Sequence, residues 1–80
     1  MTTNISKKTS KKLLMNISNF TITKESSIRE ALKKINKNKK GIILVLDNER
    51  LIGVATDGDI RRFILNNPIN NKIGKVINKR

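Results

Sequence analysis

Residues 41–65 read GIILVLDNERLIGVATDGDIRRFIL, and this stretch decides the fold. The run 42–46 is apolar throughout, which is typical of a strand buried on both faces of a sheet. Residues 47–50 have the polar composition of a four-residue turn, and residues 51–56 again favour a strand. The stretch therefore predicts a β-hairpin.

A helix is predicted directly after the hairpin. It starts over residues 57–59, where Asp59 follows Thr56 at the spacing of a capping box. The sequence Asn66-Asn67-Pro68 ends it, because asparagine and proline disfavour helix continuation. Its apolar side chains lie on one helical face and are Ile60, Phe63 and Ile64.

The preceding residues predict a short strand and a second helix. Residues 20–23 alternate apolar and polar side chains, as a strand does. Ser27 and Glu30 then have capping-box spacing, and we expect the helix to end near Asn38, with Gly41 opening the next strand. The apolar side chains of this helix recur at helical intervals and are Ile28, Ala31, Leu32 and Ile35.

The order of elements is thus strand, helix, strand, strand, helix. It predicts an α+β fold, an α/β sandwich in which two helices cover a sheet of about three strands. Two apolar groups remain at the ends. Residues 13–17 indicate a short docking turn (Leu13, Leu14, Met15, Ile17), and residues 69–77 indicate one more helical segment, weakened by Gly74 (Ile69, Ile73, Val76, Ile77).

Composition excludes several function classes. The chain has 80 residues and neither cysteine nor histidine, so disulfides, thiolate sites and histidine-based catalysis are absent. We expect no metal site, because Asp57 and Asp59 on one turn suit helix capping better than magnesium binding. With no nucleophile beside a base, we expect no catalysis and no cofactor. No apolar run is long enough for a membrane span or a signal peptide, which predicts a cytoplasmic protein.

The net charge of +12 raises the alternative of a nucleic-acid-binding protein. The excess of bases lies in the two ends and in residues 15–40, whereas residues 41–65 carry more acids than bases. Thirteen isoleucines and eleven asparagines accompany thirteen lysines, a combination that an AT-rich genome favours. Phe20 and Phe63 are the only aromatic residues, so the platform of stacking aromatics that nucleic-acid sites use is missing, and the sequence disfavours nucleic acid as a partner.

The junction at residues 53–62 is the candidate binding site. As a structural feature, Thr56 caps the helix and Asp59 complements its N-terminus. As a functional feature, the same helix end favours an anion, Asp59 suits the hydroxyl groups of a ribose, and Arg61 and Arg62 suit phosphate. Gly53, inside the strand, permits close approach to the backbone.

Residues 20–65 resemble a CBS domain, the small regulatory fold named after cystathionine β-synthase. The resemblance rests on the SIREALKKI helix, the GIILVLDNERLIGVAT hairpin and the TDGDIRRFIL helix. ITKESSIREALKKI and LIGVATDGDIRR look most like the CBS modules attached to sugar-nucleotide nucleotidyltransferases. The TDGD-RR sequence is also similar to that of arabinose-5-phosphate isomerases.

The resemblance implies a β-α-β-β-α unit that pairs with a second copy through its sheet and helices. It implies a non-catalytic regulatory module for an attached or partner enzyme, which binds an adenine nucleotide (AMP, ADP or ATP) or S-adenosylmethionine. The Gly-x-x-Thr-x-x-Asp series of Gly53, Thr56 and Asp59 would hold phosphate and ribose. Residues flanking the base would be Ile22, Gly41, Ile42 and Ile43.

The family carries two units in tandem, whereas this chain has one. We divide it into a disordered basic arm (1–14), a CBS domain (15–66) and the start of a second unit or a C-terminal tail (67–80). A homodimer would rebuild the pair, with the apolar face of the second helix in the interface. The alternative is a purely structural dimerisation module that binds no ligand.

Overall fold

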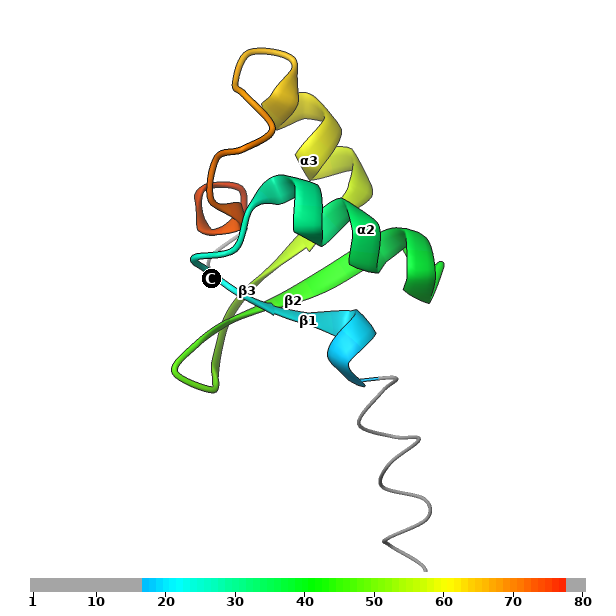
Figure 1. Cartoon of the computed structure of the whole chain (residues 1–80), viewed down its shortest axis with the longest axis vertical. Helices are drawn as coiled ribbons and strands as arrows, with labels where there is room; N and C mark the ends of the chain where they lie inside the picture. Colours follow the sequence, from blue (N-terminus) through cyan, green and yellow to red (C-terminus); the bar gives the residue numbers. More distant parts are fainter. Residues whose placement is uncertain (1–16, 78–80) are drawn as a thin grey trace, which may run out of the picture.

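The computed structural model describes residues 17–77 (Figure 1). Two helices lie over one face of a three-stranded sheet, and the polypeptide then turns back toward the sheet. In chain order the elements are β1 (Thr21–Thr23), α2 (Ile28–Asn38), β2 (Ile42–Asp47), β3 (Arg50–Thr56), α3 (Asp57–Ile64) and the single 3-10 turn η1 (Ile73–Lys75). The predicted α+β order is confirmed.

The sheet has the order β1-β2-β3, so the hairpin is joined by β1 at its β2 side. β1 runs parallel to β2, and β2 runs antiparallel to β3. Across the sheet, Ile22 lies opposite Val45, and Val45 lies opposite Gly53. This register brings the start of β2 and the end of β3 to the same end of the sheet, where Ile42 pairs with Thr56.

The core lies between the sheet and the two helices. Alternate residues of β2 are buried there, since Ile43 and Val45 have no exposed surface. Ile42, Leu44 and Leu46 point to the opposite face and are half-buried, so burial of β2 on both faces is wrong for the single chain. The fully or nearly fully buried core side chains are Ile22, Ile28, Ala31, Ile35, Ile43, Val45, Ala55, Ile60 and Ile73. The expected place of Ile60 in a dimer interface is therefore wrong, because this side chain has no exposed surface, and Phe63 and Ile64 are partly buried against the same core.

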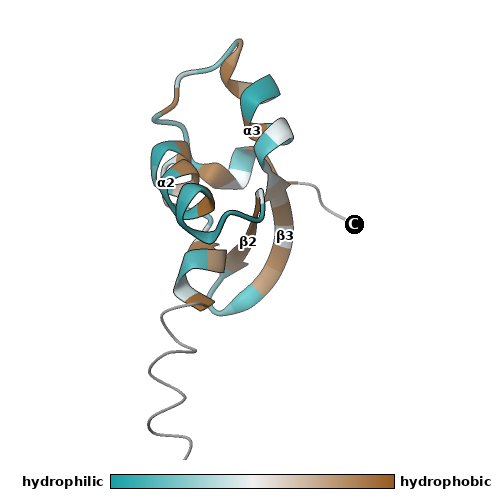
Figure 2. Ribbon diagram, turned by 90° about the vertical axis from the view of Figure 1, so that its right-hand side faces the viewer, coloured by the Kyte–Doolittle hydropathy of each residue, from teal (hydrophilic) through white to brown (hydrophobic). Residues whose placement is uncertain are grey.

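The second face of the sheet is not covered by either helix (Figure 2). Ile42, Leu44, Leu46 and Val54 lie on this uncovered face, and β2 is largely brown in the hydropathy colouring. An apolar, half-buried sheet face of this kind is typical of an interaction surface.

Local capping explains the bounds of α2. The Ser27 hydroxyl accepts a hydrogen bond from the Glu30 backbone N–H at 3.2 Å, as the capping-box spacing predicts. At the other end, Lys39 adopts a left-handed conformation (φ 59°), and its N–H donates to the Ile35 carbonyl. The predicted end near Asn38 is confirmed.

The hairpin turn lies at the predicted position. β2 extends to Asp47 and β3 starts at Arg50, so the connection consists of Asn48 and Glu49 alone. Both residues have positive φ, 52° and 68°, the conformation that a two-residue hairpin requires because its twist matches the strands. Asn48 and Glu49 are the central residues of the predicted four-residue turn over 47–50, and its outer residues, Asp47 and Arg50, also pair as the last residues of the two strands.

Residues 69–77 contain one 3-10 turn, over residues 73–75, instead of the predicted helical segment. The backbone N–H of Ile73 donates to Ser26 O at 2.7 Å, and that of Gly74 donates to Lys24 O at 3.1 Å. A Cβ atom at Gly74 would lie 3.1 Å from the Lys24 Cβ, so this glycine permits close backbone contact. We call residues 71–77 the C-terminal strap. The assignment of residues 67–80 to a second unit or a tail stays a prediction.

The predicted first strand is shorter than expected. Residues 17–20 are helical, so Phe20 precedes the strand and β1 comprises only Thr21–Thr23. The Lys34 ammonium donates to the carbonyls of Ser18 and Thr21, which ends the helical turn and leads into the strand. Of the predicted docking turn, Ile17 is half-exposed, and the other members (Leu13, Leu14, Met15) lie outside the described residues, as does the basic arm (1–14).

Candidate functional site

The candidate site lies where β3 ends and α3 begins. Thr56 is the last residue of β3 and the N-cap of α3. The N–H of Asp57 donates to the Gly41 carbonyl at 2.8 Å, which ties the start of α3 to the loop before β2. The strand register and this bond thus bring Gly41, Ile42 and Thr56 together at one end of the sheet.

Thr56 and Asp59 form a complete capping box. The Asp59 N–H donates to the Thr56 hydroxyl at 3.0 Å, and the Thr56 N–H donates to Asp59 Oδ2 at 3.2 Å. Two free N–H groups of the helix end are therefore satisfied. The structural function predicted for this pair is confirmed.

Both aspartates of the junction pair with arginines of α3. Arg62 Nη2 donates to Asp59 Oδ1 at 2.7 Å, and Arg61 Nε donates to Asp57 Oδ2 at 3.1 Å. The Asp59 side chain is only 16% exposed, whereas that of Arg62 is 72% exposed. Asp59 is thus held rigidly, while the guanidinium that neutralises it is mostly in solvent.

These bonds keep Asp59 ionised. Hydrogen bonds from the Thr56 hydroxyl and then from the Thr56 backbone N–H hold the pKa of the Asp59 carboxyl below its ordinary value. Partial burial opposes the shift, and the nearby Arg62 charge supports it. An ionised carboxylate is an acceptor only, which is the chemistry that binds the two hydroxyl groups of a ribose.

A cleft of about 430 Å³ opens beside the junction, between the C-terminal half of α2 and the start of α3. Its lining combines an apolar floor with charged rims. The lining residues are Leu32, Ile35, Asn36, Lys39, Gly41, Asp57 and Arg61.

The sequence analysis identified only part of this cleft. Gly41 and Arg61 were named as site residues, whereas Asn36 and Lys39 were not. Those two are exposed residues near the end of α2, and the sequence marks them only as polar positions of an amphipathic helix. Their contribution depends on the packing of α2 against α3, which no local motif reveals.

The side chains of the other predicted site residues do not face the junction. Ile22 is 5% exposed and Ile43 has no exposed surface, so both side chains belong to the core. Gly53 lies three positions before Thr56 on β3, opposite Val45. Of the residues named from the sequence, those at the junction are Gly41, Ile42, Thr56, Asp59, Arg61 and Arg62. The side chains of Ile22 and Ile43 point into the core, and Gly53 lies farther back along β3.

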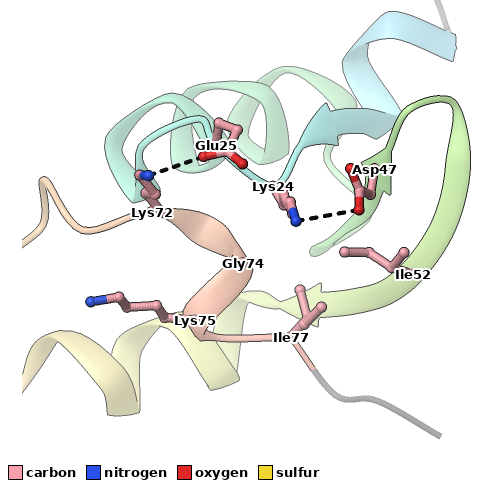
Figure 3. Close-up of a pocket in the computed structure, with 8 residues that line it drawn as sticks. All are labelled: Lys24, Glu25, Asp47, Ile52, Lys72, Gly74, Lys75 and Ile77. Carbon is pink, nitrogen blue, oxygen red and sulfur yellow. Dashed lines mark ion pairs between the residues drawn. The ribbon is translucent and has the colours of Figure 1, made fainter.

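A second hollow, of about 640 Å³, lies at the opposite end of the strands (Figure 3). Two ion pairs cross it, Lys24 with Asp47 at 3.3 Å and Lys72 with Glu25 at 3.0 Å. Gly74 of the C-terminal strap lies between these pairs in Figure 3. Its lining carries three lysines and two acids, whereas the two aspartates and two arginines of the junction balance in charge, so charge alone does not favour the junction over this hollow as an anion site.

Within residues 17–77, no helix has the length and apolar content needed to cross a membrane. Within the same residues, no three acidic side chains lie close enough together to hold a metal ion.

A three-stranded mixed sheet with two helices on one face defines a small α+β module. The family model of the CBS domain matches residues 10–66, and the chain belongs to the CBS-domain family. CBS domains are generally regulatory, non-catalytic modules. The predicted family and fold are therefore confirmed.

The curated relatives are isomerases. The chain is 40% identical over 47 residues to a probable arabinose 5-phosphate isomerase of Haemophilus influenzae, an alignment that covers 59% of this chain and 14% of that protein. It is 34% identical over 80 residues to the arabinose 5-phosphate isomerase KdsD of Yersinia pestis, covering 86% of this chain and 24% of that protein. The chain thus spans less than a quarter of these relatives. They do not support the association with nucleotidyltransferases.

Solved structures of CBS-domain proteins share the fold. A putative signal-transduction protein with CBS domains from Burkholderia ambifaria superposes with a TM-score of 0.69 at 20% identity, covering 76% of this chain and 47% of that one. A CBS domain protein from Pyrobaculum aerophilum, complexed with AMP, superposes with a TM-score of 0.66 at 19% identity, covering 74% and 48%.

Proposed function

We propose that this chain is a non-catalytic regulatory module that binds an adenine nucleotide or a related adenosyl compound at the β3–α3 junction. Ligand binding would favour one arrangement of two paired units and thereby bias an attached or partner enzyme. The CBS resemblance implies this ligand-binding function for Thr56 and Asp59, and the two arginines beside them suit the phosphate of the same ligand.

The observation that carries the proposal is the rigid, ionised carboxylate of Asp59. It lies at the N-terminus of α3, where the helix dipole favours a phosphate, and it has Arg61 and Arg62 within the next three residues. A ribose needs a fixed acceptor, and a phosphate needs donors and positive charge. Both requirements are met within one helical turn.

The comparisons support the ligand class in one further respect. The CBS domain protein of Pyrobaculum aerophilum, which shares this fold, was solved with AMP. The regulated enzyme is proposed on different grounds, since both curated relatives are arabinose 5-phosphate isomerases. We therefore propose an isomerase of this kind, in place of a nucleotidyltransferase, as the enzyme that the module serves.

Isothermal titration of the chain with AMP, ATP and S-adenosylmethionine tests the proposal. We expect saturable binding of at least one compound and a loss of at least about tenfold in affinity in Asp59→Asn, because that substitution removes a charge-assisted acceptor. Asp47→Asn is the matched control, since Asp47 pairs with Lys24 at the opposite end of the strands. Absence of binding to all three compounds, or equal loss in both variants, would contradict the proposal.

The uncovered sheet face favours a second candidate, a structural pairing module without a ligand. Four half-buried apolar side chains lie there (Ile42, Leu44, Leu46, Val54). This candidate predicts a dimer whose stability does not change when AMP, ATP or S-adenosylmethionine is added. Thermal unfolding with and without each compound separates the two candidates, because only the first predicts a ligand-dependent rise in the unfolding midpoint.

A further inference from the structure

Asn38, the last residue of α2, has a side chain that joins three parts of the chain. Its Nδ2 donates to the Asn19 carbonyl at 2.7 Å and to the Ile42 carbonyl at 3.1 Å. Its Oδ1 accepts from the Lys40 N–H at 2.7 Å. One half-buried carboxamide thus connects the segment before β1, the loop after α2 and the first residue of β2.

The loop that Asn38 holds has a conformation its residues do not favour by themselves. Lys39 has a φ of 59° and Gly41 a φ of 74°, and the left-handed region is unfavourable for lysine. The hydrogen bonds from Asn38 reach the backbone on either side of Gly41, at Lys40 and at Ile42. We infer from this arrangement that the Asn38 side chain sets the loop conformation.

The same loop forms part of the candidate cleft. Lys39 and Gly41 line it, and the Gly41 carbonyl accepts the N–H of Asp57, the first residue of α3. A change of the loop would therefore displace one wall of the cleft and loosen the start of α3, where the capping box of Thr56 and Asp59 lies.

We propose that Asn38 is a positioning residue for the ligand site: it touches no ligand itself, and it fixes the loop 39–41 against the N-terminus of α3. This proposal rests on the proposed binding of an adenosyl compound at the junction. The position requires two donors and one acceptor on a single short side chain, which asparagine supplies. An ionised aspartate of the same shape has no donor and would face two carbonyl oxygens.

The test uses Asn38→Asp, with Asn67→Asp as the matched control. Asn67 also donates through Nδ2 to a carbonyl, that of Phe63 at 2.9 Å, at the far end of α3. Two quantities are measured on the folded chain: the hydrogen-exchange rate of the Asp57 amide without ligand, and the affinity for AMP. We expect Asn38→Asp to accelerate this exchange and to weaken AMP binding at least about fivefold. The control should change neither quantity.

Gly41→Ala is the second variant in case Asn38→Asp does not fold. A Cβ at Gly41 would have no atom within 4 Å, so the substitution strains only the backbone at φ 74°. We expect the same two effects from it. Normal Asp57 exchange in Asn38→Asp or in Gly41→Ala would overturn the proposal, even where AMP affinity falls. A parent chain that binds none of the three compounds would remove the proposed function, and the exchange measurement would still decide whether Asn38 holds the loop.

Discussion

The C-terminal strap gives the sharpest test of the fold, through the substitution Ile73→Ala. Ile73 has no exposed surface and packs in the same core as Ile28 and Ile60. Removing a fully buried isoleucine side chain costs about 2–5 kcal/mol in free energy of unfolding, because a cavity is left as well as transfer energy lost. A chain of 80 residues has a total stability of about 4–12 kcal/mol. The substitution should therefore remove a large part of the stability.

Urea unfolding followed by far-UV circular dichroism measures this loss, with the slope of the transition checked for a change in the denatured state. Leu65→Ala is the matched control, because Leu65 is 79% exposed and should lose less than about 0.5 kcal/mol. A loss of less than about 1 kcal/mol in Ile73→Ala would refute the reasoning. It would mean that residues 71–77 do not belong to this core and that the division of the chain near residue 66 is also the boundary of the folded unit.

Three further predictions concern the site and the uncovered face. Thr56→Ala should lower the free energy of unfolding by about 1–2 kcal/mol in the same urea assay, since it removes an N-cap; an unchanged midpoint would contradict the capping function. Because the pKa of Asp59 is lowered in the folded chain, its ionised form stabilises the fold above pH of about 4, and this contribution is lost as the pH falls through the folded-state value. Asp59→Asn should therefore lose less stability than the parent on acidification, and parallel pH profiles would exclude this. Leu44→Lys places a charge on the uncovered sheet face and should shift a dimer to monomer in light scattering, whereas Glu49→Lys, at the hairpin turn, should not.

The architecture could be predicted because its signals are local. Apolar spacing predicted both helices and the hairpin, and the separation of Thr56 from Asp59 predicted the capping box in the first turn of α3. The backbone conformation of the hairpin turn could not be predicted in the same way. It requires positive φ at Glu49, a residue that rarely adopts this conformation, and the strands on either side impose it.

Neither the cleft nor the position of the C-terminal strap could be predicted from local sequence signals. Gly74 was interpreted as weakening a helix, whereas its function is to let the strap approach the Lys24 backbone. The apolar group that contains Ile73 indicated contact with the core, whereas the backbone hydrogen bonds that position the strap against Lys24 and Ser26 have no side-chain signature in the sequence. The contribution of Lys39 to the cleft likewise depends on a left-handed helix end and on the packing of α2 against α3.

The capping function of Asp59 does not compete with the proposed binding of ribose. An ionised carboxylate has about four acceptor positions, and the Thr56 N–H and hydroxyl use the ones that stabilise the helix end. Arg62 donates to Oδ1, and its side chain is 72% exposed. An ion pair that is so exposed to solvent contributes at most about 1 kcal/mol to the free energy of unfolding. A ribose hydroxyl can therefore replace Arg62 at Oδ1 without disturbing the cap, which leaves the guanidinium available for phosphate. On this argument Arg62→Gln should preserve the urea midpoint and weaken AMP binding, whereas equal losses of stability and affinity would show that the cap and the proposed ribose contact cannot be separated.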